Sequence, residues 1–166
     1  MDETKEASRE LTIEDFIQEF LIDEIREIKK EHPYMAFILM ASGIEFLGRY
    51  IKNDLTNTNK GKQCFNCAIQ KLSTLRTYLE GMGFNVETDD LYSNFRCGLI
   101  HQFRLTTTQM VLSNKNVTND KTIDCDRFYD IFKNACEEAI KLVAKENRES
   151  VPFIYIKTQT VDGRRE

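Results

Sequence analysis

The sequence predicts an all-α fold: a single helical bundle of about five helices, with a minor β-hairpin between the last two long helices. Apolar residues recur every three or four positions along most of the 166-residue chain, which is the period of an amphipathic helix. Only 2 prolines and 7 glycines interrupt it, which favours long regular elements. The 41% hydrophobic and 30% charged residues are typical of one globular domain.

Residues typical of helix N-termini indicate where the first two helices begin. Thr12 is a typical N-cap residue, with Asp15 at the third helical position, and an apolar stripe continues from there to Ile28. Pro33 suits the first turn of a second helix over residues 33–53. This helix is apolar around more of its circumference, so we expect it at the centre of the bundle. Its small residues would allow close approach of a neighbouring backbone: Ala41, Ser42, Gly43 and Gly48.

Two further helices are expected before residue 105. After a loop at residues 55–62, a third helix covers residues 63–80 and ends at the glycines Gly81 and Gly83. A fourth begins near Thr88 or Asp89 and continues to about Phe103. The carboxylate of Asp89 suits the positive end of that helix's dipole.

The C-terminal third combines β-like segments with one helix. Residues 105–119 are β-favouring and then turn-like, which predicts a small hairpin. The helical period returns at Asp124 or Cys125 and continues to Val143, and residues 151–158 are expected to add a strand to the hairpin. The chain thus divides into a flexible N-terminus (residues 1–11), a helical-bundle domain (12–158) and a polar C-terminal tail (159–166).

Charge and hydropathy argue against several classes of protein. The net charge is −4, whereas proteins that bind nucleic acid broadly through its phosphates usually carry a basic excess. Any contact with RNA or a nucleotide is therefore expected to be a local site. The longest nearly apolar run, residues 34–44, is too short to span a bilayer, and the charged first ten residues do not form a signal peptide. A cytoplasmic protein without membrane contact is expected.

The cysteines do not predict a metal or redox site. Their number, 5, suits a reducing compartment. Cys64 and Cys67 form a Cys-x-x-Cys pair, but a structural zinc site needs four ligands, and no second pair at matching spacing follows. Two half-buried thiols on one helix face are the favoured interpretation, and no cofactor or metal is predicted. His32, just before Pro33 at a helix boundary, suits a capping or surface role.

The chemically suggestive feature is an Arg-x4-His pair, Arg96 and His101, in the fourth expected helix. On a regular α-helix, residues five apart lie about 140° from each other around the axis. The two side chains can therefore meet only if the helix is distorted, where Gly98 would help, if the arginine wraps round it, or if a second subunit completes the site. Asn94 and Cys97 lie on the His101 side of the helix.

Glu45 is a carboxylate within the most apolar helix. Buried carboxylates are seldom left without a partner. A structural salt bridge with an arginine and a supporting role beside Arg96 are both open.

The segment around the pair resembles a known family. Residues 91–103, LYSNFRCGLIHQF, resemble the Arg-x4-6-His signature of the HEPN superfamily, in particular bacterial members in which an Arg-Cys-Gly-Leu-type run precedes the histidine. The stretch GIEFLG at residues 43–48 and the order of the helices are also similar to that family. The resemblance covers roughly the second to the fifth helix, and the specific motif is confined to Arg96 to His101.

This resemblance implies a helical-bundle domain, commonly dimeric, in which two motifs face each other across the interface. Active members are metal-independent endoribonucleases, often in toxin–antitoxin or phage-defence systems. Others bind nucleotides or serve as inactive scaffolds. The partners that it implies are RNA or a nucleotide, a second copy of the chain and an antitoxin protein.

The residue types suit RNA cleavage without a metal. The neighbouring 2′-OH is the nucleophile, so one proton must leave it and another must reach the departing 5′-oxygen. Histidine can do either near neutral pH, and a guanidinium can bind the negatively charged transition state. We therefore assign His101 as general base or acid and Arg96 as transition-state stabiliser. Asn94, Cys97 and Glu45 support them, and the expected ends are a 2′,3′-cyclic phosphate and a 5′-hydroxyl.

One position differs from the family pattern. Active members often carry Asn, Asp or His directly after the arginine, where this chain has Cys97, and a thiol is a weak donor and acceptor. A second interpretation is therefore a non-catalytic HEPN-like dimerisation module that binds a nucleotide or a partner protein. A third, a plain helical interaction domain with an accidental motif, predicts that Arg96 and His101 lie far apart.

Overall fold

The structure, a computed structural model, describes residues 6–56, 58–102, 111–113, 122–146 and 152–159. Most of the described residues are helical, which confirms the mainly helical class, but they form about six helices rather than five. The first runs without a break through α1 (Ile13–Phe16), the π-helix η1 (Ile17–Glu24) and α2 (Ile25–Glu31). The others are α3 (Pro33–Lys52), α4 (Gly61–Lys71), α5 (Ser73–Gly81), the π-helix η3 (Tyr92–Cys97) continued by α6 (Gly98–Gln102), and α7 (Cys125–Ala144).

Two predicted helix starts are confirmed at atomic detail. Thr12 and Asp15 form a capping box, in which each side chain accepts a hydrogen bond from the other's backbone N–H at 3.1 Å. The carboxylate of Asp124 accepts the N–H of Arg127 at 2.9 Å and caps α7.

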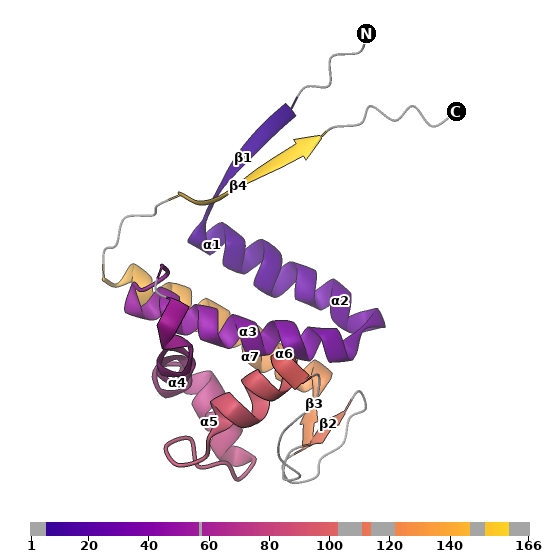
Figure 1. Ribbon diagram of the computed structural model, residues 1–166, viewed down its shortest axis with the longest axis vertical. Coiled ribbons are helices and arrows are strands. Elements are labelled where there is room, and N and C mark those ends of the chain that lie inside the picture. The colour runs from indigo at the N-terminus through magenta and orange to yellow at the C-terminus, as the bar shows by residue number, and fades with distance from the viewer. Residues whose placement is uncertain (1–5, 57, 103–110, 114–121, 147–151, 160–166) are drawn as a thin grey trace.

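Helix α3 forms the centre of the bundle, as predicted, with α2, α4 and α7 packed around it (Figure 1). The backbone of α4 comes so close that a Cβ on Gly48 would lie 1.8 Å from the carbonyl oxygen of Cys64. Among the described residues, α3 is the one helix long and apolar enough to cross a membrane. Because 61% of its most apolar window is buried inside the fold, α3 has the burial of a core helix.

The predicted third helix, residues 63–80, is in fact two helices. Leu72 is extended and fully buried between α4 and α5. The carboxylate of Glu138 on α7 then accepts hydrogen bonds from the backbone N–H and the hydroxyl of both Ser73 and Thr74, at 2.7 to 3.1 Å. A carboxylate 65 residues away thus caps the N-terminus of α5. Local periodicity in the sequence does not reveal such a long-range contact, so the break at Leu72 was not predicted.

This cap makes a testable prediction about stability. Burial acts to raise the pKa of the Glu138 carboxyl, but the hydrogen bonds from Ser73 and Thr74 outweigh it and hold the pKa below its ordinary value. The carboxylate therefore stabilises the folded state above the pKa of an unfolded glutamate, and this contribution is lost as the pH falls through the folded pKa. We expect Glu138→Gln to lower the free energy of unfolding by about 1–2 kcal/mol at about pH 7.

Urea unfolding of wild type and Glu138→Gln at about pH 7 and about pH 3 measures this effect. The difference between the two proteins should shrink at the lower pH. The neighbouring substitution Glu137→Gln is the control and should change little. Equal stability of Glu138→Gln and wild type at neutral pH would exclude the cap.

The predicted β structure needs three corrections. Strand β1 (Glu6–Thr12) occupies most of the N-terminus that we expected to be flexible. It pairs antiparallel with β4 (Pro152–Gln159), so the C-terminal strand does not join the hairpin. β2 (Val111–Ser113) and β3 (Thr122–Asp124) pair in parallel, which a hairpin cannot do. The rest of the segment expected as a hairpin, and the tail beyond residue 159, lie outside the described residues.

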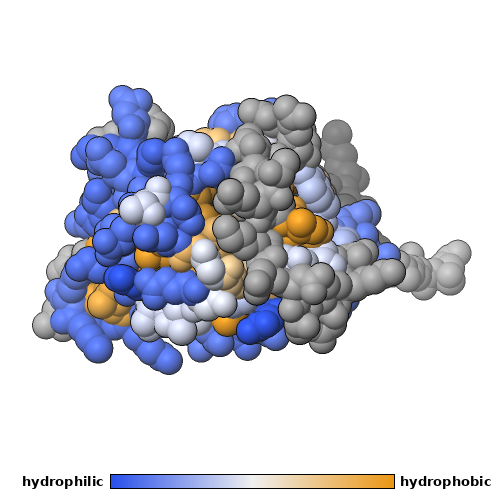
Figure 2. All heavy atoms as spheres, turned by 90° about the horizontal axis from the view of Figure 1, so that it is seen from below, coloured by the Kyte–Doolittle hydropathy of each residue, from blue (hydrophilic) through white to orange (hydrophobic). Residues whose placement is uncertain are grey.

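The surface carries few large apolar side chains among the described residues. Figure 2 shows a mostly hydrophilic face with hydrophobic residues between. The exposed large hydrophobic side chains are Tyr34, Met35 and Val111. Near two of them, a groove of about 220 Å³ lies between the start of α3 and β2; its lining is Pro33, Tyr34, Phe37, Leu112 and Ser113.

Candidate functional site

The helix that carries the Arg-x4-His pair is distorted, and the distortion is what brings the pair together. From Tyr92 to Cys97 it is a π-helix, in which the N–H of Gly98 donates to the carbonyl oxygen of Ser93, five residues before it. This widened turn accommodates one more residue than an α-helical turn, and such turns often occur at functional sites. Residues five apart can therefore share a face. The distance between Arg96 Nη1 and His101 Nε2 is 3.4 Å.

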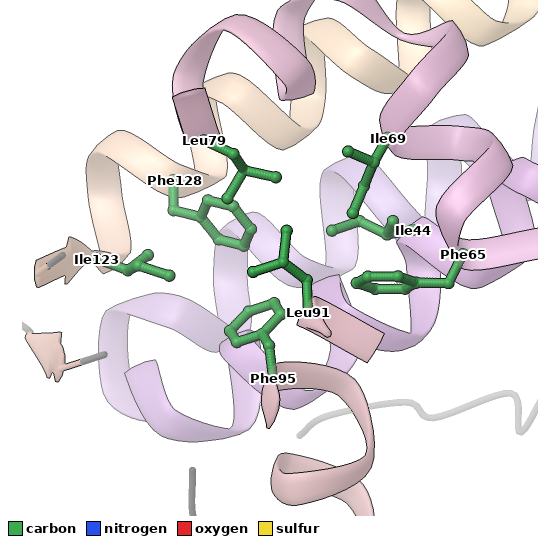
Figure 3. A pocket seen from close by; sticks show the side chains of 8 residues that line it. All are labelled: Ile44, Phe65, Ile69, Leu79, Leu91, Phe95, Ile123 and Phe128. Atoms are coloured by element: carbon green, nitrogen blue, oxygen red, sulfur yellow. The ribbon is translucent and has the colours of Figure 1, made fainter. Parts of the chain in front are cut away.

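The inner face of this helix anchors it in the core. Leu91, Phe95 and Leu99 are buried, and the Phe95 ring packs edge-on against Phe128 of α7 at 5.6 Å between centroids. Leu91 and Phe95 point into a small apolar gap of about 10 Å³ shared with α3, α4, α5, β3 and α7 (Figure 3). A gap of this size and lining is part of the core packing and holds no substrate. It lies under the side of the helix opposite to His101, which is exposed.

Arg96 is held in place by contacts with α3 and with its own helix. Its Nε faces Glu45 Oε2 of α3 at 2.7 Å. The N–H does not point along the line that joins these two atoms, so the contact is an ion pair without a well-directed hydrogen bond. The guanidinium also lies over the ring of Tyr92, 5.4 Å from its centroid. With the Nε side occupied, Nη1 is directed to His101.

Glu45 is buried between two arginines. Its Oε1 accepts hydrogen bonds from Arg49, at 2.8 Å from one terminal nitrogen and 3.3 Å from Nε, while Oε2 faces Arg96. The bond to Glu45 raises the pKa of Arg49. Glu45 thus forms the salt bridge that the sequence left open and lies beside Arg96, and its supporting role there stays a prediction. One carboxylate between two guanidinium groups leaves a net positive charge next to His101.

Tyr92 packs between Arg96 and the start of α4. Its ring contacts Phe65 edge-on at 5.7 Å, and its hydroxyl lies where Gly61 leaves room: a Cβ on Gly61 would be 2.6 Å from that oxygen and 3.0 Å from Glu45 Oε1. Burial raises the pKa of the Tyr92 phenol against the opposing charge of Arg96, and a hydrogen bond with the Cys97 thiol raises it further. The phenol is therefore neutral at physiological pH.

The other predicted residues lie as follows. Asn94 and Cys97 are both half-buried in η3, on either side of Arg96. Asn94 donates its backbone N–H to the carbonyl oxygen of Asp90, and its proposed role toward the imidazole stays a prediction. His32 is exposed at the boundary between α2 and α3. Cys64 is buried and Cys67 half-buried on α4, both as free thiols. In the described part of the chain, no three metal-binding side chains converge.

Sequence reasoning missed three residues of the site: Arg49, Tyr92 and Gly61. Arg49 had a signal, because it follows Glu45 by four positions on one helix. Tyr92 precedes Arg96 by the same spacing. Gly61 had none, since its importance comes from the close approach of α4 to two side chains of other elements.

The chain was also compared with known proteins. No family model, no curated protein and no solved structure matches it.

Proposed function

We propose that this protein is a HEPN-type, metal-independent endoribonuclease whose reaction centre is the pair Arg96 and His101. The observation that carries the proposal is the 3.4 Å contact between Nη1 of Arg96 and Nε2 of an exposed His101, with Arg96 fixed from behind by Glu45 and Tyr92. An accidental motif predicts two distant side chains with unrelated neighbours, and this contact argues against it.

In the proposed reaction, the 2′-oxygen of a ribose attacks the adjacent phosphorus while His101 moves a proton. The imidazole either accepts the 2′-OH proton or donates a proton to the departing 5′-oxygen, and the other of these two protons is exchanged with water. The guanidinium of Arg96 bears the charge that develops on the phosphate oxygens. Because Glu45 holds Arg96 before substrate arrives, little reorganisation is needed when that charge appears.

The wider setting of the proposal follows from the same resemblance. We propose a cytoplasmic homodimer in which two copies of the motif line one groove, within a toxin–antitoxin or phage-defence system and with an antitoxin protein as partner. A second copy fits an exposed His101, because the described residues do not enclose the imidazole in a pocket of one chain.

One observation favours a second candidate, a non-catalytic HEPN-like dimerisation module that binds a nucleotide or a partner protein. The residue after Arg96 is Cys97, whose thiol is a weak donor and acceptor, and Glu45 neutralises part of the positive charge beside it. Such a site would hold a phosphate without supplying a second polar group for the transition state.

Incubation of the purified protein with structured and with unstructured RNA in EDTA separates the two candidates. The endoribonuclease should cut internally and leave 2′,3′-cyclic phosphate and 5′-hydroxyl ends. Intact RNA at high protein concentration, with a nucleotide nevertheless bound, would support the non-catalytic module instead.

A further inference from the structure

Basic residues are concentrated in one part of this acidic chain. Between Arg49 and Leu79, six of the seven charged residues are basic, although the net charge of the whole chain is −4. This stretch covers the end of α3, all of α4 and most of α5. A local positive field is what a protein with a negative net charge needs in order to bind a polyanion at one place.

The outer face of α4 carries no carboxylate. At about 100° per residue, positions 62, 63, 66, 67, 70 and 71 cover one half of the helix circumference. Lys62, Gln63, Gln70 and Lys71 are exposed there, and Asn66 is half-buried. The opposite half is buried in the core. Solvent therefore meets two ammonium groups and three amides on this face.

Two more lysines extend this face. Lys52 at the end of α3 and Lys71 lie close enough to Cys67 for both charges to lower the pKa of its thiol, against burial, which raises it more. At the other end, Lys60 pairs with Asp54 at 3.1 Å and Lys62 with Asp90 at 3.0 Å. Both lysines are about half exposed, and exposed ion pairs of this kind are weak enough for a phosphate to replace the carboxylate.

The N-terminal end of α4 abuts the Arg96 site. Gly61, between Lys60 and Lys62, lies against the Tyr92 hydroxyl and Glu45, the two groups that hold Arg96. From this point α4 extends for 11 residues, or about 16 Å. The start of α4, with Lys60 and Lys62 on either side of Gly61, therefore lies next to the groups that hold Arg96.

We propose that the outer face of α4, together with Lys52 and Lys60, binds the sugar–phosphate backbone of the RNA strand that is cut at the Arg96–His101 site. This inference rests on the proposed function, which it extends with a substrate-binding surface. Ammonium groups neutralise phosphates, and the amides between them can donate to phosphate oxygens or bond with base edges. Binding of an acidic protein or an anionic membrane to this face would explain the lysines but not the amides between them.

The experiment measures the binding of a fluorescein-labelled 20-nucleotide RNA, 2′-O-methylated throughout so that it cannot be cleaved, by anisotropy at several salt concentrations. The double variant Lys62→Gln/Lys71→Gln should bind about tenfold more weakly at low salt. The slope of log affinity against log salt should fall by about 0.7 for each lysine lost, which a purely structural change would not produce. The control Lys30→Gln/Lys141→Gln loses the same charge elsewhere on the surface and should match wild type.

Equal affinity and equal salt slope in wild type and the Lys62/Lys71 variant would overturn the inference, as would lysine-dependent binding to phosphatidylserine vesicles without binding to RNA. The two proposals fail in different ways. If RNA cleavage does not depend on these lysines, the proposed reaction centre is retained and the proposed binding surface is rejected. If binding of the methylated RNA depends on the lysines but unmodified RNA is not cleaved, the binding surface is supported and the proposed endoribonuclease activity is rejected.

Discussion

Replacing His101 by alanine is expected to lower the rate of RNA cleavage by about 10²- to 10⁴-fold, the usual contribution of a group that transfers a proton in the transition state. The fold should be unchanged, because the His101 side chain is exposed. Single-turnover cleavage in EDTA, together with thermal unfolding of the same preparation, measures both quantities.

The chain offers a matched control for this variant. His32 is its other histidine and is also exposed, at the boundary between α2 and α3. His32→Ala should cleave RNA at the wild-type rate. Undiminished cleavage by His101→Ala, or an equal loss in both variants, would contradict the role assigned to His101.

The second large effect concerns Glu45. Removing one member of a buried ion pair leaves its partner charges without compensation, and two guanidinium groups depend on this carboxylate. We expect Glu45→Ala to lower the free energy of unfolding by about 3 kcal/mol. In a chain of this length, that corresponds to a fall in Tm of about 6–12 °C.

A surface pair with the same spacing provides the control for Glu45. Arg76 and Glu80 form an Arg–Glu pair four residues apart on α5, with 41% and 45% of their side chains exposed, and Glu80→Ala should cost at most about 0.5 kcal/mol. Glu45→Ala should also cleave RNA more slowly at temperatures where it is folded, since Arg96 is no longer fixed. Wild-type stability and wild-type cleavage in Glu45→Ala would show that Glu45 does not hold Arg96 in place.

Much of the helical fold could be predicted because its determinants are local. The capping box at Thr12 and Asp15, the Asp124 cap and Pro33 at the start of α3 are short-range signals, and the structure contains each of them. The central position of α3 followed from its apolar circumference, which requires burial on most sides.

The features that were missed depend on residues distant in sequence. The break at Leu72 is stabilised by Glu138 from another helix. The Tyr129 hydroxyl of α7 donates a hydrogen bond to the carbonyl oxygen of Ile22 at 2.9 Å. It thereby provides a partner for a backbone group within the π-helix η1. The pairing of β1 with β4 joins the two ends of the described chain. No local pattern carries these contacts.

The candidate site shows the same division. The sequence indicated Arg96 and His101, and a distorted helix as one way to bring them together; the π-helix and the 3.4 Å contact correspond to that option. Arg49 could have been found from its spacing to Glu45. Gly61 could not, because its role comes from the packing of α4 against Tyr92 and Glu45.

In the proposed reaction, Arg96 and His101 direct a ribose 2′-OH against its own phosphate without a metal. The most direct test is an RNA that is 2′-O-methylated at every position but one, incubated with the protein in EDTA and analysed by mass spectrometry. We expect a single cut, at the unmodified nucleotide, that leaves a 2′,3′-cyclic phosphate and disappears with His101→Ala. Cleavage at methylated positions would contradict this mechanism. So would a methylated strand that stays intact while fully unmodified RNA is cut to give 3′-hydroxyl ends.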